Sequence, residues 1–170
     1  QAGSGNTVLM LANTYIGPTT LDAGTLTLGA AGVLPDASEV SIGNATLAAG
    51  SFSETAGRLV ITGAATINLG TGAALSFANS SAIDWTGGSL GITGIFVPGV
   101  SLRFGTTSGG LTSTQLSLIS ATGFGPFALN AAGYLTAIAV GGYDAWKAQI
   151  TNGLNLPGDD ADGDGFTNLQ

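Results

Sequence analysis

The chain has 170 residues, 29 of them glycine, and only three basic against ten acidic side chains. It contains neither cysteine nor histidine, which excludes disulfides, thiolate nucleophiles and the usual general base near neutral pH. A nucleic-acid-binding protein needs a basic face to displace counterions from phosphates, so we expect no nucleic-acid partner. No apolar stretch approaches the ~20 residues of a membrane-spanning helix, so we expect no membrane span.

Short strands are predicted from the beginning of the chain. Alternating apolar and small polar residues occur over 25–28, 39–42 and 45–47. Such alternation is typical of a strand with one face in a core and the other face outward. Gly, Ala, Ser and Thr separate these segments, and small residues at corners allow successive strands to approach closely.

The strongest regularity lies between Gly57 and Arg103. Five segments with the pattern apolar, any residue, apolar begin at Leu59, Ile67, Leu75, Ile83 and Leu90. An antiparallel meander would need short hairpin turns with Asn-Gly or Asp-Gly signals, and none separates these segments. A coil of three strands fits better, with about 24 residues per turn.

This spacing predicts which strands stack. On a turn of about 24 residues, Leu59 lies under Ile83 and Ile67 lies under Leu90. Further strands are expected over 101–104 and 115–119. We therefore predict an all-β fold over residues 1–142, a right-handed, three-sided parallel β-helix (β-solenoid) of roughly five or six turns.

The pattern changes after Gly141 and Gly142. Residues 143–150 show no alternation, and Tyr143, Trp146 and Ile150 share one face of a helix. We predict a short C-terminal helix and linker over 143–157 that covers the end of the solenoid or leads into a further segment.

An acidic segment over 158–170 has the spacing of a calcium loop. Asp160, Asp162 and Asp164 alternate and are followed by Gly165, which permits the sharp turn that directs carboxylates toward one Ca²⁺. The backbone carbonyl of Phe166 and the side chain of Asn168 would be the next ligands. The bidentate Glu of an EF-hand-like loop would fall one residue past Gln170, and a solvated acidic linker is the alternative.

Two segments resemble known families. Residues 8–29 read VLMLANTYIGPTTLDAGTLTLG. They resemble the autotransporter-associated β-strand repeat, except that Pro18 stands where glycine is usual. The resemblance implies a secreted parallel β-helix of structural or adhesive role, without catalytic residues. The acidic segment is similar to the Asp-rich loops of dockerin-like and thrombospondin type 3 repeats.

The acids elsewhere do not form a catalytic pair on this scheme. Glycoside hydrolysis needs two carboxyl groups across a cleft, but position 60, one turn below Asp84, is Val, and Glu54 has Ala78 above it. Trp85 lies two residues after Ile83 and so on the same face of the predicted strand. This position favours burial of Trp85 in the core over stacking on a sugar. We therefore expect no enzyme.

These observations favour a secreted structural protein at a bacterial surface. The unpaired ends of a solenoid favour head-to-tail self-association into a filament or surface layer, in which residues 1–6 could extend onto a neighbouring copy. The alternative is an adhesin or carbohydrate-binding passenger domain that binds surface glycans. A polysaccharide-active β-helix enzyme is the third hypothesis.

Overall fold

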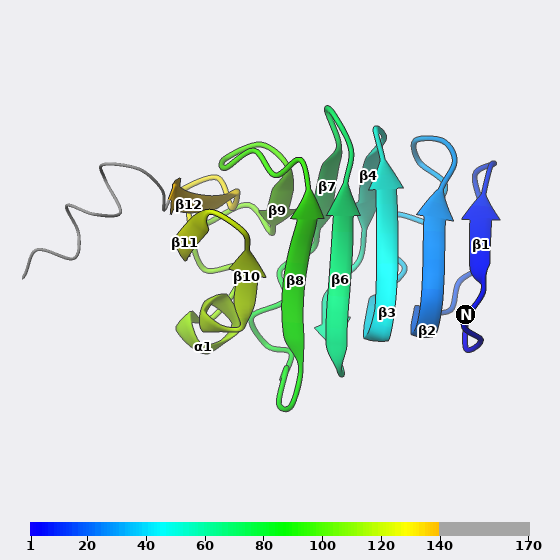
Figure 1. Cartoon of the computed structure of the whole chain (residues 1–170), viewed down its shortest axis with the longest axis horizontal. Coiled ribbons are helices and arrows are strands. Elements are labelled where there is room, and N and C mark those ends of the chain that lie inside the picture. The colour runs from blue at the N-terminus through cyan, green and yellow to red at the C-terminus, as the bar shows by residue number, and fades with distance from the viewer. Residues whose placement is uncertain (140–170) are drawn as a thin grey trace, which may run out of the picture. The chain divides into compact units, whose positions relative to one another are not determined.

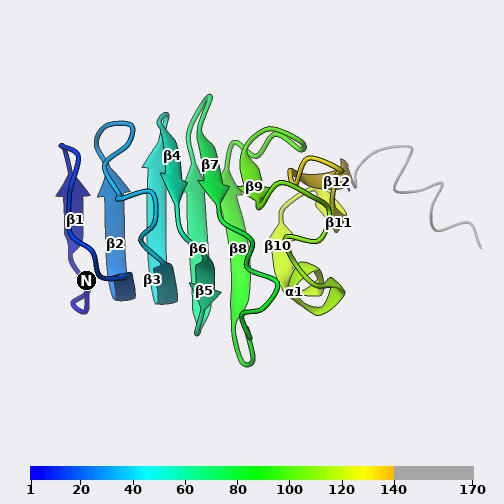
Figure 2. The ribbon, with the colours of Figure 1, turned by 180° about the vertical axis from the view of Figure 1, so that it is seen from behind.

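The chain folds as a solenoid of parallel stacked coils. The structure is a computed structural model, and it describes residues 1–139. Residues Gln1–Ala137 form one compact unit. The chain ascends one side of this unit, returns down the other, and advances by one strand per turn in a right-handed sense, for about four turns (Figures 1 and 2). The predicted all-β, parallel β-helical fold is confirmed.

Two parallel sheets form the walls of the solenoid. The larger sheet follows the order β1-β2-β3-β6-β8-β10, with β5 beside β3 and with β11 and β12 beyond β10. Its strands are β1 Asn6–Leu9, β2 Thr19–Leu28, β3 Val40–Gly50, β5 Leu59–Ile61, β6 Ala64–Leu69, β8 Ser89–Gly94, β10 Ile119–Ala121, β11 Phe124–Leu129 and β12 Leu135–Ala139. The smaller sheet contains β4 Ser53–Ala56, β7 Ala74–Phe77 and β9 Leu102–Phe104.

Each turn has three sides because β2 and β3 each pass a corner. The first part of β3 pairs with β5, whereas its later part pairs with β6. Gly43 lies at this corner, where a Cβ would be 3.4 Å from the Asp22 carbonyl oxygen of the preceding turn. The third side is the β4-β7-β9 sheet.

Alternation along the strands places the core. In β5, β7 and β9 the outer two residues of each apolar triplet are buried and the middle residue is half-buried. In the larger sheet, Leu26, Leu47, Ile67 and Ile92 are aligned by register from turn to turn and are all buried. Stacking like residues in this way keeps the core apolar along the whole axis.

The predicted turn length and stacking are wrong, and the solenoid has about four turns rather than the five or six predicted. Hydrogen bonds between early turns join residues 20 or 21 apart, as from Ala64 N to Asn44 Oδ1. The later step is longer, since Asn68 pairs with Thr93, 25 residues on. Leu59 therefore pairs with Val40, and Ile67 pairs with Ile92 rather than with Leu90. A constant interval between apolar triplets does not reveal how many residues each corner contains.

The predicted strand at Ile83–Trp85 is also wrong. These residues lie in a loop between β7 and β8. Asp84 accepts a hydrogen bond from the backbone N–H of Thr86, which closes a local turn. The apolar-polar-apolar pattern thus arises from one buried Trp in a loop rather than from a strand.

The predicted strand over 115–119 is a helix for most of its length. The helix α1, Ser113–Ser117, begins with a capping box. The Thr112 hydroxyl accepts a hydrogen bond from the Gln115 backbone N–H, and the Gln115 side-chain oxygen accepts one from the Thr112 backbone N–H. Only Ile119 continues into a strand, β10. The helix predicted over 143–157 and the acidic segment over 158–170 lie outside the described residues.

Candidate functional site

None of the candidate calcium ligands falls within the described residues. Asp160, Asp162, Asp164, Phe166 and Asn168 all follow residue 139. Residues 1–139 contain no group of three or more acidic side chains placed to hold a metal ion. The calcium loop therefore stays a prediction from sequence.

Glu54 is the one buried acid among the described residues. It lies in β4, where its carboxylate accepts hydrogen bonds from the backbone N–H groups of Val33 (2.7 Å) and Leu34 (3.3 Å) of the preceding turn. Because β4 is the first strand of the smaller sheet, no strand of the earlier turn pairs with it. The Glu54 carboxylate thus accepts from the backbone N–H groups of the earlier turn, at a place where no strand of that turn pairs with β4.

The environment of Glu54 favours its neutral form. Burial raises the pKa of the Glu54 carboxyl above its ordinary value, and the nearby charge of Asp36 acts in the same direction. Hydrogen bonds from Val33, Leu34 and Thr55 oppose this shift without cancelling it. A raised carboxyl pKa is also found in general acids, but Glu54 is only 5% exposed and is engaged with its own backbone. The protein's own backbone therefore occupies this carboxyl group.

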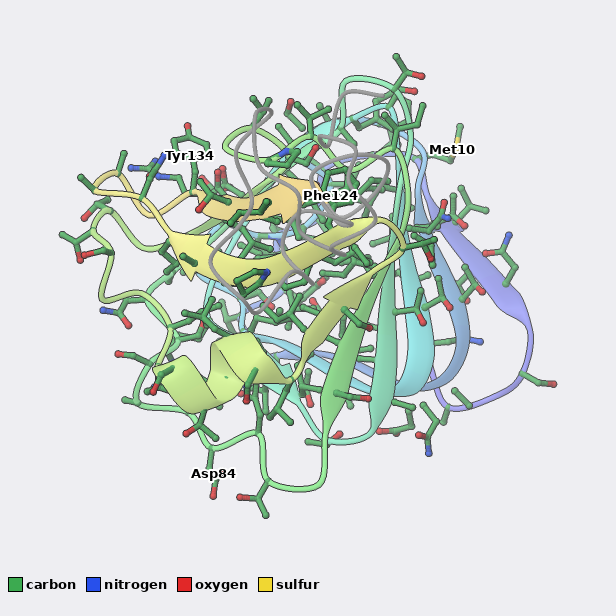
Figure 3. All side chains as sticks on the ribbon, turned by 60° about the vertical axis from the view of Figure 1, so that its left-hand side comes forward. Met10, Asp84, Phe124 and Tyr134 are labelled. Atoms are coloured by element: carbon green, nitrogen blue, oxygen red, sulfur yellow. The ribbon has the colours of Figure 1, made fainter. Side chains whose placement is uncertain are left out.

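Asp84 is exposed and lies apart from Glu54. Figure 3 shows Asp84 on a loop, with its side chain directed away from the ribbon. The loop and α1 border a surface hollow of about 460 Å³ that also includes Thr86, Thr112 and Gln115. With one acid on its wall, this hollow does not offer the pair of carboxyl groups that sugar hydrolysis requires.

Trp85 is buried, as predicted, and 1% of its side chain is exposed. Its indole Nε1 donates a hydrogen bond to the carbonyl oxygen of Leu59. The ring therefore closes the core above β5 and offers no face on which a sugar could stack.

The outer face of the larger sheet is rich in hydroxyl groups, and Asp22 in β2 is its one exposed acid among the described strands. Its outward positions include Thr25, Thr46 and Thr66 in one row across β2, β3 and β6. The strands β1, β2, β3, β5, β6, β8 and β10 contain no aromatic residue. The exposed aromatic row that a sugar-binding face would require is absent from these strands.

Within the described residues, β1 is the outermost strand of the larger sheet. It pairs with β2 on one side and has no neighbouring strand on the other. β1 and the segment after it contain exposed apolar side chains, whereas most large apolar residues of this unit are in the core. They are Val8, Met10, Leu11, Tyr15 and Ile16.

The N-terminal residues fold back on their own first turn. The amino group of Gln1 donates to the Thr20 carbonyl oxygen at 2.7 Å, and the Asp22 N–H donates to the Gln1 carbonyl oxygen at 2.8 Å. The side chain of Gln1 also accepts a hydrogen bond from the Thr7 hydroxyl. In this structure residues 1–6 therefore lie against the turn that follows them.

The C-terminal end of the same unit is covered. β11 pairs antiparallel with β10, and Phe124 and Phe127 pack around Phe96 with ring centroids 5.2 and 6.1 Å away. Beside this strand pair, the side-chain amide of Gln115 in α1 donates hydrogen bonds to the carbonyl oxygens of Ser80 and Ile83. The edge of β10 is thus covered by a reversed strand, and β12 becomes the last described strand of the larger sheet.

Sequence reasoning missed this difference between the ends. The run of apolar residues over 8–11, without alternation, is the signal that could have indicated an exposed apolar segment. The contact between Gln115 and Ser80 at the other end could not be predicted, because nothing in the local sequence distinguishes these buried polar residues from exposed ones.

No known family model, curated protein or solved structure matches the chain. The β-solenoid fold therefore stands on the structure alone. Within the described residues, no helix is long and apolar enough to span a membrane.

Proposed function

We propose that this protein is a secreted, non-catalytic β-solenoid that serves as a structural element of a bacterial surface and associates with further copies of itself. The observation that supports this most directly is the fold, in which parallel coils stack along one axis. Solenoids of this kind present long continuous surfaces.

The absence of catalytic chemistry among the described residues supports the same proposal. Residues 1–139 hold no cluster of acids, and their one buried acid, Glu54, binds its own backbone. The sequence contains no His or Cys to activate a serine or threonine. A secreted autotransporter-associated repeat protein, the family that residues 8–29 resemble, would have these properties.

The form of the association differs from a simple filament. Head-to-tail stacking requires two open ends, whereas β11 and the Phe96 cluster cover the C-terminal end of the described unit. A filament or layer would therefore require at least one contact elsewhere on the molecule.

Electron microscopy and sedimentation velocity of the purified 170-residue chain test the structural proposal. We expect defined assemblies whose population rises with protein concentration. Particles that stay monomeric at the highest concentration would contradict it. The outer-face threonine rows do not favour the adhesin alternative, since sugars bind best to exposed aromatic rings; glycan-array binding without self-association would favour the adhesin instead.

The acidic segment is proposed to bind Ca²⁺ through Asp160, Asp162 and Asp164, with Phe166 and Asn168 completing the available ligands. Isothermal titration with CaCl₂ after chelation tests this. The substitution Asp162→Ala should abolish the heat of binding, while Asp159→Ala, outside the alternating set, should preserve it. A titration without heat in the unsubstituted chain would indicate a solvated linker.

A further inference from the structure

Three threonine side chains form a straight row across the outer face of the larger sheet. Thr25 of β2 pairs with Thr46 of β3, and Thr46 pairs with Thr66 of β6. Each of these three strands has a neighbouring strand on both sides, so the row lies on the side wall of the solenoid. Adjacent strands are about 4.8 Å apart, and the hydroxyl groups of the row therefore repeat at about this distance.

A second row runs parallel to the first, two residues further along each strand. It consists of Thr27, Ala48, Asn68 and Thr93, which the register aligns across β2, β3, β6 and β8. Two residues of a strand span about 6.6 Å. The two rows together form an array of small side chains with repeats of about 4.8 and 6.6 Å.

The hydroxyl groups of the first row are available to an external partner. No side-chain hydrogen bond within residues 1–139 involves Thr25, Thr46 or Thr66, whereas the Thr112 hydroxyl accepts from the Gln115 N–H. A threonine hydroxyl donates one hydrogen bond and accepts two. The row thus presents donors and acceptors at regular intervals, each held by a β-branched side chain with little rotational freedom.

The part of the face that contains these rows is uncharged and flat. Residues 23–28, 44–50, 64–69 and 89–94 contain no charged side chain, although the whole chain carries a net charge of −7. Asp22 lies beside the array, at the corner near Gly43. Figure 1 looks onto this face, and β2, β3, β6 and β8 run side by side there with little twist. Side-chain ladders are one cause of such flatness.

The size and composition of the array decide between possible partners. Four strands of about six residues cover about 400 Å², which is half of the roughly 800 Å² per partner in a stable protein interface. The strands β2, β3, β6 and β8 also contain no aromatic residue, the usual anchor for a protein partner or a sugar ring. A rigid, periodic set of hydroxyl groups is instead complementary to a periodic lattice of water.

We propose that this face binds ice. The repeat of about 4.8 Å is close to the spacing of water molecules along one axis of a prism face of ice, and side-chain movements adjust the repeat of about 6.6 Å to the other axis. The threonine hydroxyls bind lattice water, and the threonine methyl groups order the water beside them. Many weak contacts made at once add up to firm attachment. This activity goes beyond the structural role and does not depend on self-association.

Gly91 of β8 interrupts the first row and allows a test by gain of function. It pairs with Thr66. A Cβ at Gly91 would lie 3.9 Å from Thr66 Oγ1 and 3.7 Å from the Ala65 carbonyl oxygen, which is ordinary van der Waals contact. Gly91 is not among the glycines with positive φ. The substitution Gly91→Thr therefore fits the strand and extends the row to a fourth strand.

Thermal hysteresis, the interval between the melting point of an ice crystal and the temperature at which it grows, tests the proposal. The purified 170-residue chain should show such an interval, Gly91→Thr should widen it, and Thr46→Lys should remove most of it at equal concentration. Thr55→Lys is the matched control, because Thr55 is exposed on the outer face of the smaller sheet, in a row with Ser76 and Arg103. It should keep the full interval.

Ice partition provides a second measurement that does not depend on the size of the interval. When ice grows slowly from the solution, the unsubstituted chain and Thr55→Lys should enter the ice, while Thr46→Lys should stay in the liquid. A chain that stays in the liquid and shows no hysteresis would overturn the proposal, as would equal losses for Thr46→Lys and Thr55→Lys. If Thr46→Lys fails to fold by circular dichroism, Gly91→Thr decides, and an interval that is not wider contradicts the proposal.

Sedimentation velocity separates this proposal from the structural one. A chain that enters ice and is monomeric at every concentration would contradict self-association alone. A chain that assembles and stays out of the ice would contradict ice binding alone.

Discussion

The two ends of this solenoid solve the same problem in different ways. At the C-terminal end, the edge of β10 is covered by a reversed strand, and Gln115 binds the Ser80 carbonyl oxygen. Further back along the axis, Ser80 and Trp85 bind the backbone of Leu59 at the edge of β5. Among the described residues, β1 has no strand on its other side, and apolar side chains near it are exposed. The comparison teaches that the chain can close the edge of a sheet with its own residues.

The largest expected effect is the loss of Trp85. Trp85→Ala removes a fully buried ring and its hydrogen bond to Leu59, which should lower the free energy of unfolding by about 3–5 kcal/mol. Urea denaturation measures this. Leu11→Ala in the exposed segment after β1, measured below the association concentration, should change it by less than about 0.5 kcal/mol. Similar losses at both sites would remove the contrast between the ends.

A close backbone approach at the capped end should be nearly as sensitive. A Cβ at Gly110 would meet the Phe104 carbonyl oxygen at 1.8 Å, so Gly110→Ala must displace one of two turns. We expect a loss of about 2–4 kcal/mol, by the same mechanism as overpacking of a core. Gly17→Ala is the control, since its Cβ would enter open space. Thermal unfolding with equal midpoints for the two variants would contradict the described packing.

The polar cap at α1 should contribute less than the Trp85 ring. Gln115→Ala leaves the buried carbonyl oxygens of Ser80 and Ile83 without their donor, which should cost about 1–3 kcal/mol. Thr114→Ala, exposed on the same helix, tests whether any change in α1 has this effect. Equal unfolding free energies for Gln115→Ala and the unsubstituted chain would show that the helix does not close the edge.

The smallest effect concerns the pH dependence set by Glu54. Because burial raises its pKa, the folded state binds a proton at a pH at which the unfolded chain is already ionised. Its contribution to the free energy of unfolding is therefore fully present below the unfolded pKa and is lost as pH rises through the folded pKa.

The substitution Glu54→Gln isolates this contribution. The amide keeps an acceptor for the Val33 and Leu34 N–H groups and does not ionise. As pH rises from about 4, the ordinary pKa of a glutamate, through the raised pKa of Glu54 in the folded state, the unsubstituted chain should lose stability relative to the variant. A stability difference between the two proteins that is constant with pH would show that Glu54 titrates as it does in the unfolded chain.

The sequence predicts the fold well because alternation reports burial directly. The strands at Leu59, Ile67 and Leu75 have their apolar residues inward as expected. The stacking partners could not be predicted, since they depend on the number of residues in each corner. That number changes between β6 and β8, where the loop containing Trp85 is inserted.

The candidate site could be predicted only in part. Burial of Trp85 follows from its parity with Ile83, although both lie in a loop. By contrast, α1 replaces a predicted strand because the capping box of Thr112 and Gln115 outweighs the alternation over 115–119. The burial of Glu54 depends on its position in the first strand of a sheet, which local sequence does not encode.

Hydrogen–deuterium exchange at low and high protein concentration tests the contrast between the ends most directly. We predict that in the 170-residue chain the amides of Asn6 and Val8 in β1 exchange freely in dilute solution, while the Leu59 amide, held by Ser80, is protected at every concentration. Equal protection of β1 and of Leu59 in dilute solution would contradict the contrast between the two regions.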